Sequence, residues 1–96
     1  MQVVENWAEL QGDVLEYIPD PNLPNHTISR IKVRTIRAIE GYPNLFQSSV
    51  GQVLEIKLPV PKQSRDLPPV SNAVVWRIRR GGPQSIFIHP DDLNTA

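Results

Sequence analysis

The residues best suited to chemistry in this chain are two histidines, His26 and His89, and the two acids that follow the second histidine. In the run His89-Pro90-Asp91-Asp92, an imidazole and two carboxylates could contribute to a metal site. Such a site needs three or four converging ligands, and one short segment does not supply them. The same run is typical of a strand end followed by a proline-led helical turn, where acids are favourable near the first turn. We therefore expect no metal or other cofactor.

Enzymatic chemistry has little other support in the sequence. No serine stands in a nucleophile-elbow pattern, and no glycine-rich loop has a phosphate-binding form. The pair Gly81-Gly82 is typical of a turn. The chain has no cysteine, which excludes thiolate metal ligands and disulfides. We expect a protein that is not an enzyme.

Charge is strongly segregated along the chain, although the formal net charge is zero. Residues 1–29 carry five acids and no base, residues 30–80 carry all ten bases with three acids, and residues 81–96 carry two acids. The three blocks therefore have net charges of −5, +7 and −2. A chain segregated in this way can build a charged surface that a neutral total hides.

Arginine and aromatic residues near the C-terminus predict a protein-binding surface. Seven of the ten bases are arginine, and arginine and aromatic side chains are enriched at interface anchors. If the last two strands pair so that residue numbers sum to 164, Arg77 lies opposite Phe87 on the outer face. The predicted partner-binding residues are Arg77, Phe87, Arg79, Arg80, Val75 and His89.

The alternative partner is single-stranded nucleic acid, bound through the basic row Arg30, Lys32 and Arg34. Such a row could contact phosphates and make binding depend on salt. Barrels that bind single strands add aromatic stacking platforms to a basic groove, and the strands beside this row contain few aromatics. A sequence pI of about 6.7 also argues against a nucleic-acid-binding domain. We therefore rank a protein partner first.

Prolines show which elements must position these side chains. The ten prolines fall in clusters, and proline cannot donate to a sheet ladder, so each cluster marks a connection. Between the clusters, segments alternate in polarity or are rich in β-branched residues, as strands are. The segments expected as strands are 8–18, 27–39, 51–58, 73–79 and 85–88. A helix over 3–11 competes at the N-terminus, and whether residues 1–7 form a helix, a strand or neither stays open.

Five such strands and no long helix predict an all-β fold, a small five-stranded antiparallel barrel with long proline-rich loops. The layout resembles an OB-like or an SH3-like barrel, with a sandwich as the alternative. Ninety-six residues are enough for one domain, spanning 1–96. The longest connection, 59–72, holds four prolines and is interpreted as either a contact segment or a linker between the third and fourth strands.

Register can be tested on the first hairpin. With residue numbers summing to 45, Val14 faces Ile31 inside the barrel, and Asp13 faces Lys32 outside it. The polarity pattern changes phase at Ile36, which indicates a bulge or a strong bend. The acidic first strand then offsets much of the basic second strand.

The expected function is that of a non-catalytic binding or accessory module. No segment is apolar for long enough to span a membrane, and the N-terminus lacks the features of a secretion signal. A cytoplasmic location is expected. The predicted partner is another protein, and the oligomeric state stays open.

Overall fold

The computed structural model describes residues 6–61, 67–81 and 85–93. Strands dominate this part of the chain, which confirms the all-β class. The elements are β1 (Ala8–Pro19), β2 (Thr27–Ala38), the 3-10 turn η1 (Gln47–Ser49), β3 (Val53–Leu58), β4 (Ala73–Arg80), β5 (Ile86–Ile88) and the 3-10 turn η2 (Pro90–Leu93). Each of the five strands lies close to a segment that the proline clusters and the alternation of polarity predicted as a strand.

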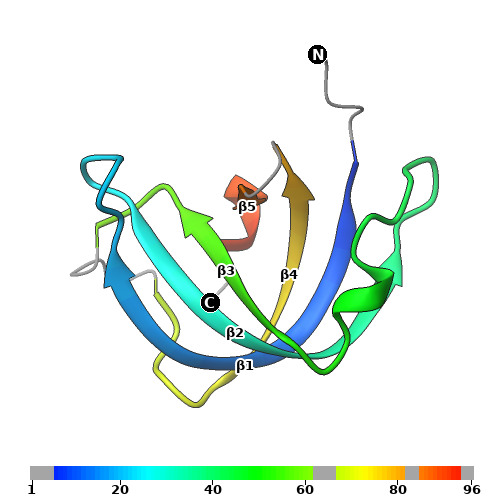
Figure 1. The fold of residues 1–96 in the computed structure, drawn as a ribbon, viewed down its shortest axis with the longest axis horizontal. Coiled ribbons are helices and arrows are strands. Elements are labelled where there is room, and N and C mark those ends of the chain that lie inside the picture. The colour runs from blue at the N-terminus through cyan, green and yellow to red at the C-terminus, as the bar shows by residue number, and fades with distance from the viewer. Residues whose placement is uncertain (1–5, 62–66, 82–84, 94–96) are drawn as a thin grey trace.

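The strands form a closed barrel in the order β1-β2-β3-β5-β4, with β4 returning to β1 (Figure 1). This architecture fits the OB-like or SH3-like expectation. One feature differs: β3 and β5 run parallel, at the pair Lys57 and Phe87, so the barrel is mixed and not wholly antiparallel. The reason is topological, because a closed ring with an odd number of strands cannot reverse direction at every step.

The long strands β1 and β2 curve along the length of the barrel (Figure 1). Their register agrees with the predicted one at Val14 and Ile31. It then shifts by one residue, leaving Arg34 as an extra residue on β2, so that Leu10 lies opposite Ile36. The bulge indicated by the phase change is confirmed, and it turns Ile36 toward the core.

A second register shift lies at Leu15 of β1, between the pairs formed by Val14 and Glu16. It places Tyr17 against the core and leaves Ile18 outside the core cluster, the reverse of simple alternation. Burial raises the pKa of Tyr17 to about 12. The backbones of β1 and β2 approach each other closely at Gly12, between these two shifts. A Cβ on Gly12 would collide with the Lys32 carbonyl oxygen, so this position requires glycine.

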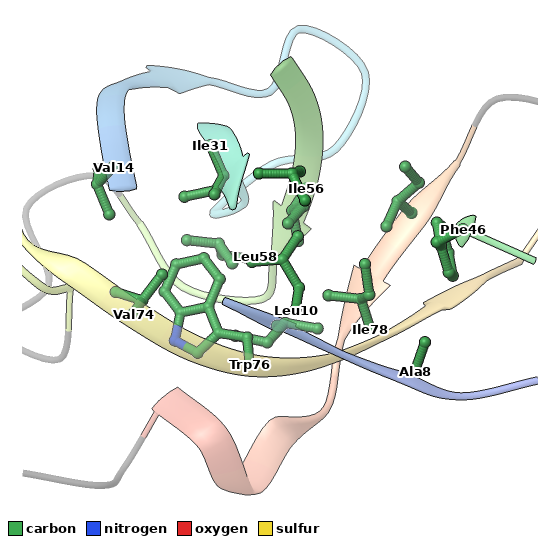
Figure 2. Close-up of a cluster of buried hydrophobic side chains, with 13 residues drawn as sticks. Ala8, Leu10, Val14, Ile31, Phe46, Ile56, Leu58, Val74, Trp76 and Ile78 are labelled. Carbon is green, nitrogen blue, oxygen red and sulfur yellow. The ribbon is translucent and has the colours of Figure 1, made fainter. Parts of the chain in front are cut away.

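The barrel interior is filled by aliphatic side chains, together with Trp76 from β4 and Phe46 from the segment after β2 (Figure 2). Phe46 is fully buried and packs at the end of the barrel near Ala8 and Ile78. The buried core residues are Ala8, Leu10, Val14, Ile31, Val33, Phe46, Ile56, Leu58, Val74, Trp76, Ile78, Ile86 and Ile88.

The described parts of the 59–72 connection belong to the barrel. Val60 and Leu67 pack against the core. The Thr27 hydroxyl donates to the Val60 carbonyl at 2.8 Å, and the Tyr17 hydroxyl donates to the Pro68 carbonyl. The backbone after Pro69 then continues the sheet beside Val14. Residues 62–66 lie outside the described chain, and the role of the whole connection stays a prediction.

The β4–β5 register differs from the predicted one by two residues. Ile78 pairs with Ile88, and Phe87 pairs with Arg79 instead of Arg77, so residue numbers sum to 166. A shift of two residues leaves every side chain on its own face of the sheet, so the polarity pattern cannot distinguish the two registers. The residues in contact with Phe87 are therefore different from those expected.

Candidate protein-binding face

A row of outward-facing side chains crosses four neighbouring strands. Lys57 of β3 pairs with Phe87 of β5, and Phe87 pairs with Arg79 of β4. Trp7 directly precedes β1 and lies beside Arg79. These four point outward, because neighbouring residues along the chain are buried, namely Asn6, Ala8, Ile56, Leu58, Ile78, Ile86 and Ile88. We call Lys57, Phe87, Arg79 and Trp7 the aromatic–arginine row.

Arg79 is the centre of this row. Its guanidinium carbon lies 5.8 Å from the centre of the Trp7 ring and 5.7 Å from the centre of the Phe87 ring. Both distances are within the range of cation–π contacts. The side chain is exposed, and it has no carboxylate partner among the residues that the structure describes. Two rings thus flank an arginine whose N–H groups remain available to a ligand.

The side-chain amide of Asn6 holds the start of β1 on β4. Its Nδ2 donates to the Arg80 carbonyl at 3.0 Å, and its Oδ1 accepts from the Arg80 N–H at 2.8 Å. These two bonds replace one rung of the β1–β4 ladder, and Asn6 is only 1% exposed. The neighbouring Trp7 is thereby fixed beside Arg79. Neither residue was among the predicted site residues, because the pattern before residue 8 left the local structure open.

Two further contacts position the aromatic rings. A Cβ on Gly81 would lie 2.8 Å from Cδ2 of Phe87, so the ring packs directly on the glycine backbone. The imidazole of His89 lies 5.0 Å from the Trp7 ring, centre to centre, at an interplanar angle of 53°. Its Nδ1 accepts the Asp91 backbone N–H at 3.2 Å. His89 thus joins the row at the Trp7 end.

Arg77 is engaged within the protein. Its Nη2 lies 2.8 Å from Asp92 Oδ1, its Nε lies 3.2 Å from both carboxylate oxygens, and its backbone N–H donates to Oδ2 at 2.6 Å. Burial alone would raise the pKa of Asp92, but the hydrogen bonds from Arg77 outweigh burial and lower it. Asp92 therefore holds η2 on the outer side of β4.

The predicted partner-binding residues are therefore divided among three places. Phe87, Arg79 and His89 lie together with Trp7. Val75 is 55% exposed and lies opposite Gln11, beyond Arg77 along β4. The guanidinium of Arg80 lies 5.1 Å from the ring centre of the buried Phe46.

Three hollows follow the aromatic–arginine row. The first, of about 270 Å³, is lined by His26, Lys57, Pro59, Ile88 and the other row residues. A second, of about 120 Å³, shares Trp7 with it and adds Ile39, Tyr42, Arg77 and His89. A third, of about 340 Å³, shares Lys57 and includes the loop after β1 and Ser85. Neighbouring hollows share a lining residue, Trp7 in one case and Lys57 in the other, so they lie next to one another along the row, and together we call them the groove.

Lys57 is neutralised where it borders the groove. Its Nζ lies 3.0 Å from Oδ2 of Asp20, whose side chain is fully buried. The other carboxylate oxygen accepts the N–H groups of Asn22 at 2.9 Å and Leu23 at 3.3 Å. The Asn22 bond first, and then the bond from Lys57, lower the pKa of Asp20. The loop between β1 and β2 is thereby anchored to β3.

The alternative basic row lies on the outer surface of β2 and is largely offset by acids. Arg30 lies between Glu16, at 3.1 Å, and Glu55, at 3.0 Å. Arg34 lies 2.8 Å from Asp13. The third member of the row, Lys32, faces Asp13 across the strand pair, as the register predicted.

Among the described residues, no group of three or more His, Asp or Glu side chains is placed to hold a metal ion. In the same part of the chain, no helix combines the length and apolarity needed to cross a membrane. No family model, curated protein or solved structure matches the chain.

Proposed function

We propose that this protein is a non-catalytic binding module that recognises a protein partner through the aromatic–arginine row and His89. The observation that carries the proposal is the position of Arg79, flanked by Trp7 and Phe87 and exposed above a hollow of about 270 Å³. Tryptophan and arginine are the residue types most enriched among interface hot spots. The absence of cysteine is in keeping with a reducing cytoplasm as its location.

Rigidity of the site supports the same proposal. Binding costs less free energy when interface side chains are already ordered in the free protein. Here Asn6 fixes Trp7, Gly81 supports the ring of Phe87, and the two rings confine Arg79. The face is thus organised before a partner arrives.

Nucleic-acid binding through Arg30, Lys32 and Arg34 has weaker support. Each arginine of that row already pairs with a carboxylate of the same molecule. A phosphate would have to compete with those acids, and counterion release from the row would be small. The charge arrangement therefore favours a protein partner.

Affinity capture combined with chemical cross-linking tests the proposal. Wild-type protein, the double variant Arg79→Ala/Phe87→Ala and the control Arg34→Ala are used as baits in extracts of the source cells. We expect a partner that cross-links near the row, is retained by Arg34→Ala and is lost by the double variant. Recovery of the same proteins with all three baits would overturn the proposed face.

Titration with single-stranded DNA and RNA at low and moderate salt tests the alternative. The alternative expects binding with a steep salt dependence that is lost in Arg30→Ala/Lys32→Ala and retained in Arg79→Ala. Absence of binding at low salt removes the alternative.

A further inference from the structure

We infer that the groove binds an extended peptide segment of the partner, with an aspartate or glutamate carboxylate seated on Arg79. The inference rests on the proposed function and goes further, since it names the chemistry of the bound segment. It is carried by the charge balance of the groove, by its shape and by the apolar character of its walls.

The charged side chains that line the groove favour a carboxylate as the ligand group. Within the described part of the chain, Arg79 has two aromatic rings beside it and no carboxylate, whereas Lys57 pairs with Asp20 and Arg77 pairs with Asp92. Among the described residues that line the groove, Arg79 is therefore the guanidinium or ammonium group without a carboxylate partner. One available cation suits one carboxylate, while a polyanion would need several.

The guanidinium group of Arg79 also favours a carboxylate ligand. The guanidinium is planar, and its fork of N–H groups matches the two oxygens of a carboxylate. The Trp7 and Phe87 rings lie within cation–π range of this guanidinium, and none of its N–H groups is hydrogen-bonded to a carboxylate of the residues that the structure describes. Lysine could not reproduce this arrangement, because an ammonium group has no planar fork.

The length of the groove selects an extended chain. From Lys57 to Trp7 the row crosses three gaps between neighbouring strands. At about 4.8 Å for each gap, the row spans roughly 14 Å, which is the length of four or five extended residues. The second hollow, which is lined by Trp7 and Tyr42, adds room at that end. A single small anion would leave most of this surface uncovered.

The apolar residues on either side of Arg79 indicate which residues of the bound peptide flank its acid. Pro59, Phe87 and Ile88 line the hollow toward β3. On the other side, Trp7, Ile39 and Tyr42 line the next hollow. Apolar side chains next to the acid would bury surface against both walls. The expected segment therefore carries one acid between apolar or proline residues.

Selection from a phage-displayed library of random 12-residue peptides tests the inference with the whole protein. The bait is wild-type protein, and the library is first depleted on Arg79→Gln. We expect enriched peptides with an aspartate or glutamate between apolar residues. Replacement of that acid by its amide in the synthetic peptide should weaken binding about tenfold, as loss of a charge-assisted contact does. Arg79→Lys should weaken binding by a similar factor, and Arg37→Ala, at an exposed arginine outside the groove, should leave it unchanged.

Three results would overturn the inference: enriched peptides without an acid, equal binding to wild type and Arg79→Gln, or no enrichment at all. NMR spectra of Arg79→Gln in which the amide signals outside the groove match those of wild type establish that this variant folds. Competition by a single-stranded oligonucleotide at moderate salt would also count against a peptide ligand. If captured partners still depend on Arg79 and Phe87, the proposed function stands while this inference fails.

Discussion

The ring of Phe87 lies directly on the backbone of Gly81, so closely that any β-carbon on Gly81 would strike the ring. Phe87 in turn flanks Arg79, on which the proposed binding depends. Gly81 therefore supports the binding face from beneath Phe87, although Gly81 is not itself one of the residues of that face. It offers a way to disturb the face while keeping all of its side chains.

Gly81→Ala should displace the Phe87 ring and weaken partner or peptide binding several-fold. The far end of a side chain can move aside at little cost, so stability should change by less than about 1 kcal/mol. Fluorescence polarisation measures the expected loss of binding, and unfolding in urea measures the expected small change in stability. Gly51→Ala serves as a control for the binding measurement, because Gly51 lines none of the three hollows and a Cβ there would meet no atom within 4 Å. Unchanged binding in Gly81→Ala would show that the ring position does not matter.

Gly12→Ala should destabilise the barrel by about 1–3 kcal/mol, the usual cost of overpacking. The new methyl group would meet the Lys32 carbonyl oxygen and lie 2.7 Å from Cγ2 of Ile31. Urea unfolding of this variant, compared with Gln11→Ala on the exposed face of the same strand, measures the effect. Equal stability of the two variants would contradict the close approach of β1 and β2.

Ser29→Ala should stabilise the protein by about 1 kcal/mol. The Ser29 hydroxyl is fully buried and has no hydrogen-bond partner among residues 6–61, 67–81 and 85–93, so its desolvation is uncompensated. Thr27→Val is the matched comparison, because the Thr27 hydroxyl donates to the Val60 carbonyl and its loss should destabilise by about 1 kcal/mol. Thermal unfolding measures both variants: the midpoint should rise in Ser29→Ala and fall in Thr27→Val. A midpoint of Ser29→Ala below that of wild type would contradict the prediction.

Stability should fall in acid, through Asp20 and Asp92. The pKa of each carboxyl is lowered in the folded protein, so the folded state binds these protons less readily than the unfolded chain. Each contribution is therefore complete above the ordinary aspartate pKa of about 3.9, and it is lost as the pH falls through the lowered folded value. Urea unfolding between pH 7 and pH 2 measures the loss. Asp92→Asn should be less stable than wild type at pH 7, and the difference should shrink at pH 2; a constant difference would contradict this linkage.

Much of the barrel could be predicted from the sequence, because alternation and proline spacing report directly on strands and connections. The β1–β2 register followed from Val14 and Ile31, and the bulge followed from the change of phase near Ile36. A closed ring of five strands requires at least one parallel pair, but the sequence did not show that β3 and β5 form it, because local patterns carry no information on which strands meet at closure. The β4–β5 register was wrong for a related reason, since two registers two residues apart bury the same side chains.

The candidate site was predictable only in part. Phe87, Arg79 and His89 were expected on one face, and the structure brings them together around Trp7. The engagement of Arg77 by Asp92 depends on η2 returning onto β4, which no spacing in the sequence indicates. Trp7 was missed because the pattern before residue 8 fitted a helix as well as a strand.

The single rung between β3 and β5 has a mechanical consequence. Phe87 pairs with Lys57 on one side and with Arg79 on the other, so the shortest strand both completes the cylinder and supplies an aromatic wall of the groove. A ligand lying across the groove would span this junction from outside. Occupancy would then add to the free energy needed to part the two strands, by the ordinary linkage between ligation and unfolding. The place where the cylinder is joined by the fewest backbone contacts is thus the place that a bound segment would reinforce.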